Sequence, residues 1–430
     1  MAKSLKAIQS LRGMTDLLPE RSSAWSCMEK KIFDILTMYS FEEIRTPIVE
    51  NTNLFQRSIG EITDIIEKEM YSFPDRNNEL LSLRPEGTAG CVRAAIESGL
   101  LNTPRKFYYS GPMFRYEKPQ KGRHRQFHQI GGEVFGYSSV NSDAELIIMN
   151  HRFWDSLGLL DNIKLIINNI GSSESREKYK AVLVEYLSDY KSSLNENDLS
   201  RLKSNPLRIL DSKDRNIKSI LKNAPCIVDY ISTESVERQD KLLEILKTNK
   251  IRYEINSSLV RGLDYYNDTV FEWVSDNLGA QGTVCAGGRY DNLVEKLGGK
   301  STPAVGFAIG LERLFLLLEV NNFSSLNVKK SPDICIIVSK EEFHQYAFTI
   351  SEDVYNRFPI LKISHDFSKS TIKSQFKRAD KIGAKLVFII GEEEVKQNSI
   401  SVKNLRTGEQ SKFYIDQSKD QFFDFLSKTI

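Results

Sequence analysis

The stretch RYEKPQKGRHRQFHQIGGEVFG, at Arg115–Gly136, indicates the loop and the return strand of a β-hairpin. A run rich in Phe, Tyr and Met precedes it at 106–114, and a run with regular apolar positions returns at 126–135. Because successive side chains of a strand point to opposite faces, one face of the return strand carries Arg125, Phe127, Gln129, Gly131 and Glu133. Buried polar groups need partners, so this face does not cover an ordinary apolar core.

The loop of this hairpin is strongly basic. It contains Lys118, Lys121, Arg123, His124 and Arg125, with Glu117 as its one acidic residue. Positive charge concentrated at a hairpin tip predicts a polyanionic ligand, either the phosphates of a nucleotide or a nucleic acid.

The composition is that of a large globular protein. The 430 residues suffice for about three domains, and 40% hydrophobic with 27% charged residues exclude a disordered chain. No apolar run approaches the roughly 20 residues that cross a bilayer, and segment 1–14 lacks the apolar centre of a secretory signal. Five cysteines without a CxxC pair favour reduced thiols. We therefore expect a cytoplasmic protein that makes no membrane contact. Since the net charge is only +2, nucleic-acid contacts would depend on local patches.

The N-terminal segments predict an arm, a helix and a strand. Residues 1–20 are expected to be extended, with a turn at 12–14, and apolar positions at helical spacing predict a helix over Trp25–Tyr39. FEEIRTPIVE, at Phe41–Glu50, alternates like a strand. Because proline cannot donate to a strand ladder, Pro47 places that strand at a sheet edge or where a second subunit meets it.

LSLRPEGTAGCVRAAI, at Leu81–Ile96, predicts a strand, a tight turn and a helix. Glu86, Gly87 and Thr88 lie in the turn, where a carboxylate and a hydroxyl could face a pocket floor. A structural role suits the same residues, with Thr88 capping the helix and Glu86 favouring its positive end. The local sequence leaves both interpretations open.

The middle of the chain combines a polar helical segment with further strands. A helix is expected over 143–160, and the polar, lysine-rich residues from about 165 to 254 predict an inserted, largely helical subdomain. Strand patterns return at 256–274 and 282–294. Pro303–Val320 predicts a strand followed by a helix, and Arg313 lies among apolar neighbours in the first turns of that helix. Its guanidinium is therefore expected to face a cleft.

A polar linker at 321–333 precedes a small α/β pattern. Strands are expected at 333–339, 360–364, 385–391 and 399–405, with helices at 341–358 and 369–383. The basic residues of its central segment are Lys362, Lys369, Lys373, Lys377, Arg378, Lys381 and Lys385. A solvated helix face and a nucleic-acid patch both account for such a run.

Several common motifs are absent. GGKST, at Gly298–Thr302, is not a phosphate-binding loop, because Val294 stands where that loop needs its first glycine. The chain has no GxGxxG, HExxH or GxSxG motif. His124 and His128 are four residues apart but lie on a predicted strand rather than on one helical face. We therefore expect no protein-ligated metal.

The sequence resembles the class II aminoacyl-tRNA synthetases, and in particular the bacterial-type histidyl-tRNA synthetase family, over essentially its whole length. The Trp25–Tyr39 helix with FEEIRTPIVE resembles class II motif 1, GPMFRYE with RQFHQIGGEVFG resembles motif 2, and GFAIGLERL resembles motif 3. LVRGLDYYNDTVFEW, at Leu259–Trp273, and AGGRYDNLVEKLGG, at Ala286–Gly299, resemble two blocks specific to the histidyl family.

The resemblance implies an α+β fold and a homodimer. A six-stranded antiparallel catalytic sheet flanked by helices would occupy residues 1–325, with the helical insertion at about 170–253. A C-terminal α/β anticodon-binding domain would occupy residues 326–430.

The resemblance also implies a reaction and residue roles. L-histidine would react with ATP, which carries Mg²⁺, to give histidyl-adenylate, and the histidyl group would pass to tRNA(His). Arg115 and Arg261 match the catalytic arginines on the α-phosphate. The implied histidine-binding residues are Glu86, Gly87, Thr88, Gln129, Glu133, Arg261, Tyr265 and Tyr266, with Gly131 and Gly132 leaving room for the ring. The implied ATP-binding residues are Arg115, Arg123, Phe127 and Arg313.

The implied tRNA contacts are Lys118, Gln120 and Lys121 at the acceptor end and Lys373, Lys377 and Arg378 at the anticodon. Lys118 replaces an arginine of many bacterial relatives, which favours a phosphate contact over base reading, because lysine lacks the planar fork.

Two alternatives compete with an active synthetase. A synthetase-like regulatory subunit of histidine biosynthesis would lack the anticodon domain and depart from LVRGLDYY, whereas both features are present here. A plain nucleic-acid-binding module would not account for the pocket-facing residues Glu86, Gln129 and Glu133.

Overall fold

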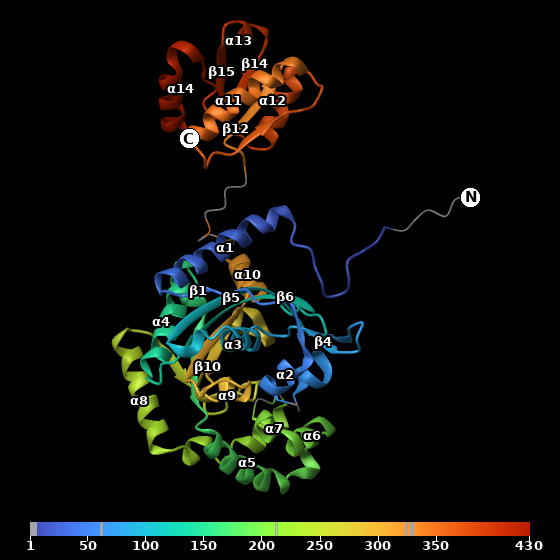
Figure 1. Ribbon diagram of the computed structural model, residues 1–430, viewed down its shortest axis with the longest axis vertical. Coiled ribbons are helices and arrows are strands. Elements are labelled where there is room, and N and C mark those ends of the chain that lie inside the picture. The colour runs from blue at the N-terminus through green and yellow to red at the C-terminus, as the bar shows by residue number, and fades with distance from the viewer. Residues whose placement is uncertain are drawn as a thin grey trace, which may run out of the picture. The chain divides into compact units, whose positions relative to one another are not determined.

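The computed structural model describes residues 7–60, 63–210, 212, 214–321, 323, 326 and 331–430. The chain forms two compact units, Met1–Asn327 and Val328–Ile430, whose elements are labelled in Figure 1.

An eight-stranded sheet forms the centre of the first unit. Its strand order is β1-β5-β6-β11-β10-β9-β7-β8. The strands are β1 (Glu42–Glu43), β5 (Arg105–Phe114), β6 (Gln126–Phe135), β7 (Lys164–Asn169), β8 (Tyr253–Ile255), β9 (Asn267–Val274), β10 (Thr283–Arg289) and β11 (Ala304–Gly310). The six strands from β5 to β7 are antiparallel, whereas the short edge strands β1 and β8 pair in parallel. The expected six-stranded antiparallel sheet is therefore present, with one short strand added at each edge.

The predicted hairpin is the pair β5–β6. Its register runs from Phe114 opposite Gln126 to Arg105 opposite Phe135. At the loop tip Gln120 bridges to Arg123 around a two-residue turn, in which Gly122 has a φ of 72°. Arg125, which was predicted to share one strand face with Phe127 and Glu133, precedes β6 and does not line the cavity described below; its guanidinium lies 3.8 Å from the centre of the Tyr116 ring.

The run at Phe41–Glu50 forms two strands rather than the one that alternation predicted. β1 is at the edge of the large sheet, and β2 (Val49–Asn51) is at the edge of a second sheet with the order β2-β4-β3. The other strands of that sheet are β3 (Ser72–Pro74) and β4 (Leu80–Leu83). Pro47 lies between the two short strands, where no ladder requires its missing N–H.

Helices cover the sheet and its edges. They are α1 (Pro19–Met38), α2 (Thr52–Ile59), the short π-helix η1 (Ile65–Glu69), α3 (Thr88–Glu97), α4 (Asn141–Ser156), α9 (Leu293–Lys296) and α10 (Leu311–Val320). The indole rings of Trp154 in α4 and Trp273 in β9 lie 5.9 Å apart. Because Glu272 alternates with Trp273, it points to the opposite face of the sheet, which is the face that contains the cavity described below. No helix among the described residues is long and apolar enough to cross a membrane.

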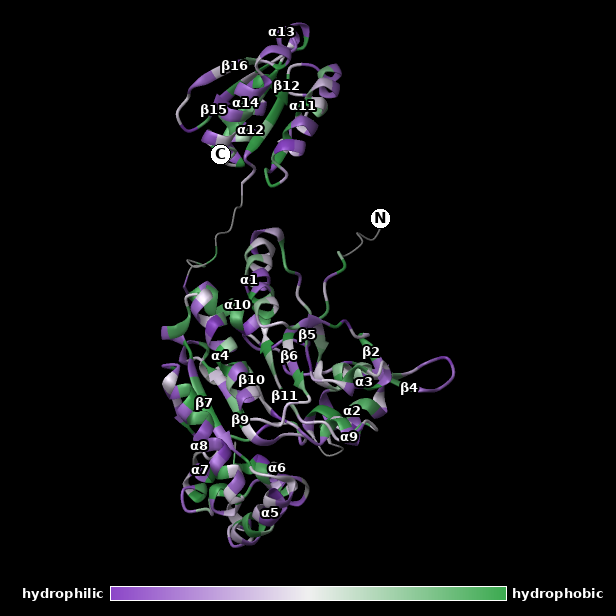
Figure 2. Ribbon diagram, turned by 60° about the vertical axis from the view of Figure 1, so that its left-hand side comes forward, coloured by the Kyte–Doolittle hydropathy of each residue, from purple (hydrophilic) through white to green (hydrophobic). Residues whose placement is uncertain are grey.

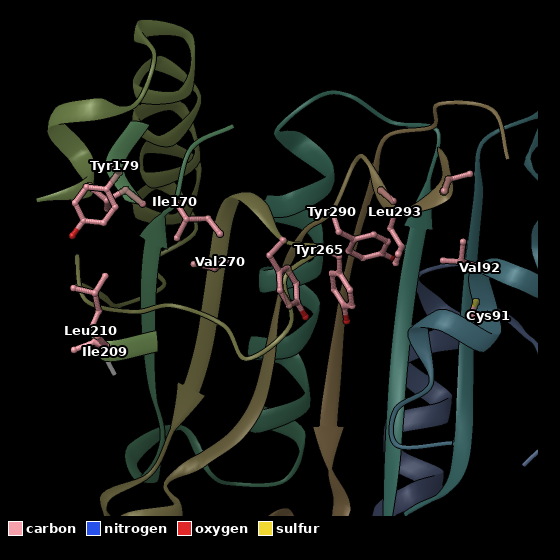
Figure 3. Close-up of a cluster of buried hydrophobic side chains, with 14 of the residues drawn as sticks. Cys91, Val92, Ile170, Tyr179, Ile209, Leu210, Tyr265, Val270, Tyr290 and Leu293 are labelled. Atoms are coloured by element: carbon pink, nitrogen blue, oxygen red, sulfur yellow. The ribbon is translucent and has the colours of Figure 1, made fainter. Parts of the chain in front are cut away.

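The segment between β7 and β8 is largely helical. It contains α5 (Ser173–Ser188), α6 (Glu196–Ser204), α7 (Arg215–Leu221) and α8 (Thr233–Thr248), with short 3₁₀ turns between them. Its core is continuous with that of the sheet. Figure 3 shows Tyr179, Ile209 and Leu210 of this segment in one buried cluster with Tyr265 and Tyr290.

The second unit is a small α/β domain. Its sheet has the order β13-β12-β14-β15-β16, formed by β12 (Ile334–Val338), β13 (Ile363–His365), β14 (Leu386–Ile390), β15 (Ser399–Asn404) and β16 (Gln410–Tyr414). Its helices are α11 (His344–Arg357), α12 (Ile372–Lys381), α13 (Glu392–Lys396) and α14 (Ile415–Thr429). The predicted strands and helices are present, and β16, α13 and α14 are additional. Every residue of β12 is buried, and Figure 2 shows this strand as strongly hydrophobic.

Candidate active site

A cavity of about 380 Å³ lies over the strands β6, β9, β10 and β11. The predicted residues that line it are Glu86, Thr88, Arg115, Arg123, Phe127, Gln129, Glu133, Arg261, Tyr265, Tyr266 and Arg313. Gly87, also predicted, is not among the lining residues, and a Cβ added to it would meet the ring of Tyr109, which does line the cavity, at 2.1 Å. The fold thus brings together residues from four separate stretches of sequence.

Glu133 is at the inner end of the cavity and is surrounded by hydroxyl groups. Its Oε1 accepts hydrogen bonds from Thr88 Oγ1 at 2.7 Å and from Tyr109 at 3.3 Å, and its Oε2 accepts one from Tyr290. The side chain is 1% exposed. Burial raises the pKa of Glu133 from the ordinary 4.5 to about 8, although the three hydroxyls oppose the shift. Burial therefore favours the neutral, protonated form of this carboxyl group in the free site.

Glycines make room for this arrangement, but not all as predicted. A Cβ on Gly306 would meet Glu133 Oε2 at 1.6 Å, so β11 cannot have a side chain at this position. Gly131 leaves room for the Tyr109 phenol rather than directly for a ligand ring, and Gly132 leaves room for Phe307.

Glu86 combines the two roles that the sequence left open. Its carboxylate lines the cavity and also accepts hydrogen bonds from the backbone N–H groups of Thr88 and Ala89, at 2.7 and 2.8 Å. Glu86 therefore caps helix α3, and Thr88 does not, since the Thr88 hydroxyl is bonded to Glu133. Burial raises the pKa of Glu86 despite these bonds.

Three tyrosines pack around the same end of the cavity. The rings of Tyr265 and Tyr266 lie 4.6 Å apart, and Tyr265 meets Tyr290 edge-on at 5.5 Å. All three rings are buried. Nearby, Gln129 contributes a buried Oε1 that has no hydrogen-bond partner among the described residues. This end is therefore a slot lined by tyrosine rings, with the buried Oε1 of Gln129 beside it.

Arg261 connects this slot to the outer part of the cavity. It forms an ion pair with Glu272, and its guanidinium lies 5.7 Å from the centre of the Tyr266 ring. Glu272 also accepts a hydrogen bond from Thr283 Oγ1 at 2.9 Å, and the Thr283 carbonyl accepts one from Arg313 at 2.7 Å. Burial lowers the pKa of Arg261, but Glu272 and the two tyrosines raise it by more, so the net shift is upward.

The outer part of the cavity is cationic. Burial, together with the neighbouring charges of Arg123 and Arg115, lowers the pKa of Arg313 to about 10. Arg115 donates to the Pro85 carbonyl at 2.9 Å, and its guanidinium lies 5.3 Å from the centre of the Phe127 ring. Three guanidiniums that repel one another across a cavity favour the binding of a polyanion, which relieves that repulsion.

The predicted tRNA contacts lie outside this cavity. Lys118, Gln120 and Lys121 are exposed on the hairpin loop, and Lys373 and Lys377 are exposed on α12. Arg378 differs from its neighbours, because it is bonded to Asp366 at 2.8 Å and to the side chains of the adjoining serines.

Several residues of the cavity were not predicted from the sequence. Tyr109, Tyr290, Glu272 and Thr283 are among its lining residues. Tyr290 and Glu272 lie inside the two blocks that resemble the histidyl family, so their position in these blocks could have identified them as site residues. Tyr109 gave no signal, because an aromatic residue in a strand usually packs in a core. Among the described residues, no group of three or more His, Cys, Asp or Glu side chains is arranged to hold a metal.

Comparisons with known proteins agree with this arrangement. Residues 13–314 match a family model described as histidyl-tRNA synthetase, and residues 333–428 match one described as anticodon binding domain. A histidine–tRNA ligase from Marinomonas sp. (strain MWYL1) is 52% identical over 412 residues, which cover 96% of this chain and 97% of that protein.

Solved structures give the same result. The apo histidyl-tRNA synthetase of S. aureus matches with a TM-score of 0.80 at 36% identity, over 97% of this chain and 100% of that chain. A structure titled ATP phosphoribosyltransferase regulatory subunit/histidyl-tRNA synthetase, from Bacillus halodurans C, matches with a TM-score of 0.64 at 22% identity, over 90% of this chain and 99% of that one. At that identity the likeness concerns the fold alone.

Proposed function

The chain belongs to the histidyl-tRNA synthetase family, and we propose that it activates L-histidine with ATP and transfers the histidyl group to tRNA(His). The presence of the anticodon-binding domain favours this reaction over a regulatory role without aminoacylation. The observation that carries the residue assignments is the contrast between the two ends of one cavity, a hydroxyl-lined carboxylate at one end and clustered guanidiniums at the other.

The inner end suits the amino acid. An imidazole ring offers two polar nitrogens, and Glu133 and Tyr266 can satisfy both, with Tyr265 lining the slot. The unpartnered Oε1 of Gln129, together with Glu86 and Thr88, suits the α-amino group. An apolar competitor of similar size would leave these buried groups unpaired, which gives strong discrimination without editing.

The first step needs no general base. The ionised carboxylate of histidine attacks the α-phosphorus of ATP, and the bond to pyrophosphate breaks. The protein must therefore neutralise the phosphate charges and hold the two reactants in line. Arg115 and Arg261 are assigned to the α-phosphate, on opposite sides. Each presents a planar set of N–H donors, the geometry that binds carboxylate and phosphate oxygens in pairs.

The outer end suits ATP. Phe127 and Arg313 are assigned to the two faces of adenine, and Arg123 and Arg313 to the γ-phosphate. Mg²⁺ is taken to arrive with the nucleotide as part of the substrate. The carboxylates of the outer cavity are already engaged, since Glu117 pairs with Arg123 and Glu272 with Arg261.

The remaining assignments concern the whole molecule. The catalytic domain is assigned to residues 1–325, with its insertion at about 170–253, and the anticodon-binding domain to residues 326–430. Lys118, Gln120 and Lys121 are assigned to the acceptor end of tRNA, and Lys373, Lys377 and Arg378 to the anticodon side. A cytoplasmic homodimer completes the proposal.

Arg261→Ala tests the proposed chemistry. Removal of one donor that stabilises a transition-state charge typically costs about 3 kcal/mol, so adenylate formation should fall by at least about 100-fold. Histidine-dependent ATP–pyrophosphate exchange measures this step without tRNA, and circular dichroism with gel filtration checks that the variant is folded. Near-normal exchange in a folded variant would contradict the role of Arg261.

A further inference from the structure

The inserted subdomain is bonded directly to the loop that carries Arg261. This loop, at 256–266, joins β8 to β9 and contains only turns and bends. Arg208 Nη2 donates a hydrogen bond to the Gly262 carbonyl at 3.1 Å, and Asn205 Nδ2 donates one to Asp264 Oδ1 at 2.8 Å. Both donors lie in the 3₁₀ turn region after α6, so the loop is fastened on each side of Leu263 by residues of the insertion.

The Nη1 atom of Arg208 is bonded to a second segment of the catalytic unit. This atom donates to Asp64 Oδ2 at 3.0 Å. Asp64 directly precedes η1, which ends at Glu69, and the Glu69 carbonyl accepts a hydrogen bond from the Tyr116 N–H at 2.6 Å. One guanidinium therefore connects the loop of Arg261 with the segment that supports the neighbour of Arg115.

Two of these three hydrogen bonds are partly buried. The Arg208 side chain is 16% exposed and Asn205 is 8% exposed, so their bonds to Asp64 and Asp264 are screened less than those of surface pairs, whereas the bond to the Gly262 carbonyl is exposed. The adjoining Ile209 and Leu210 lie in the same buried cluster as Tyr265, as Figure 3 shows. On the far side of the loop, the Asp264 N–H donates to the Ile59 carbonyl at 3.2 Å. The loop is thus held from both sides.

We propose that Arg208, supported by Asn205, is a positioning residue of the inserted subdomain that sets the placement of Arg261 for adenylate formation. It acts through the Gly262 carbonyl and touches no reacting atom. The inference rests on the role proposed for Arg261. A guanidinium that must face a transferring phosphate is sensitive to small displacements, since a shift of about 1 Å can cost on the order of 100-fold in rate.

The chain offers a matched control for this proposal. Arg201 lies in the same insertion and approaches the same Asp64, at 3.9 Å, but it makes no bond to the loop of Arg261 among the contacts of the described residues. The rate of adenylate formation should fall by about 10- to 100-fold in Arg208→Ala and stay near normal in Arg201→Ala. Arg208→Lys can keep the ion pair with Asp64 but not both bonds, so we expect it to recover only part of the rate.

A double variant separates positioning from general destabilisation. If Arg208 acts through Arg261, then Arg208→Ala in an Arg261→Ala background should cause little further loss in single-turnover adenylate formation. Additive losses, or a normal rate in Arg208→Ala, would overturn the proposal. If Arg208→Ala does not fold, the same comparison is made with Arg208→Lys. A normal rate in Arg261→Ala alone would refute the role proposed for Arg261, whereas absence of histidine-dependent exchange in the unaltered protein would refute the proposed function.

Discussion

The hydroxyl of Thr88, at the start of α3, donates a hydrogen bond of 2.7 Å to the carboxyl group of Glu133 in β6. This bond joins two segments that lie 45 residues apart, and it fixes Thr88 to the residue assigned to the imidazole. The hydroxyl also lines the cavity beside Glu86, whose carboxylate caps the same helix. The two buried acids are thus linked through one threonine, and both have raised pKa values.

Glu133→Gln should change how the stability of the free protein depends on pH. The folded-state pKa of Glu133 is about 8, above its ordinary 4.5, so the folded protein holds this proton more tightly than the unfolded chain. The resulting stabilisation is complete below the unfolded-state pKa and is lost as pH rises through about 8. Urea unfolding at several pH values should show a smaller decline between pH 5 and pH 8 in Glu133→Gln, roughly as the pKa difference requires. Equal declines in both proteins would contradict this account of Glu133.

Tyr290→Phe should weaken histidine recognition. The variant removes the hydroxyl that holds Glu133 Oε2, and a hydrogen bond contributes about 1 kcal/mol net, so the KM for histidine should rise by roughly fivefold. The KM for ATP should not change, because Tyr290 is at the other end of the cavity from the three guanidiniums.

Tyr109→Phe is the matched comparison for that variant. Its hydroxyl lies 3.3 Å from Glu133 Oε1, an oxygen that Thr88 also holds at 2.7 Å. Its effect on the KM for histidine should therefore be smaller. A larger effect than that of Tyr290→Phe would show that Oε1, not Oε2, controls the orientation of Glu133.

Arg313→Ala should raise the KM for ATP by about tenfold or more, because it removes a charged contact to the nucleotide, while the KM for histidine stays near its original value. Burial, Arg123 and Arg115 lower the pKa of Arg313 to about 10, which leaves it charged at neutral pH. Pyrophosphate exchange with each substrate varied in turn measures both constants. A rise confined to the KM for histidine would show that histidine, and not ATP, binds at the end of the cavity that contains Arg313.

The basic residues of α12 should divide into two groups. Lys373→Ala with Lys377→Ala should raise the KM for tRNA several-fold without changing pyrophosphate exchange, because both side chains are exposed and contact phosphate through charge alone. Arg378→Ala should also lower the melting temperature of the C-terminal unit, since Arg378 is bonded to Asp366. An unchanged KM for tRNA in the double lysine variant would contradict a tRNA contact and indicate that these lysines only form a solvated helix face.

Local patterns in the sequence predicted most of the fold. Alternation and turn residues predicted the β5–β6 hairpin to within one residue of its bounds, and helical spacing predicted α10 and the part of α1 from Trp25 onward, although α1 already begins at Pro19. The pattern failed at Phe41–Glu50, because alternation continues through Pro47 although the chain there leaves one sheet for another. It also missed α14, whose apolar positions are few, with Phe422 and Leu426 as its buried residues.

The site was less accessible to such reasoning. The family motifs indicated Glu133, Arg115 and Arg261, but spacing along the chain does not reveal which hydroxyls surround a carboxylate. The Arg208–Gly262 bond joins residues 54 positions apart, within a stretch whose charges are typical of a solvated surface. Contacts of this kind depend on how the insertion packs against the sheet, which no local pattern encodes.

The most direct test of the central claim is amino-acid-dependent ATP–pyrophosphate exchange by the purified full-length protein, without tRNA, with each of the twenty amino acids. The slot formed by Glu133, Tyr265 and Tyr266 and the guanidiniums of Arg115 and Arg261 predict exchange with histidine alone. Absence of exchange with every amino acid, from a well-folded protein, would contradict an active synthetase and favour the regulatory alternative.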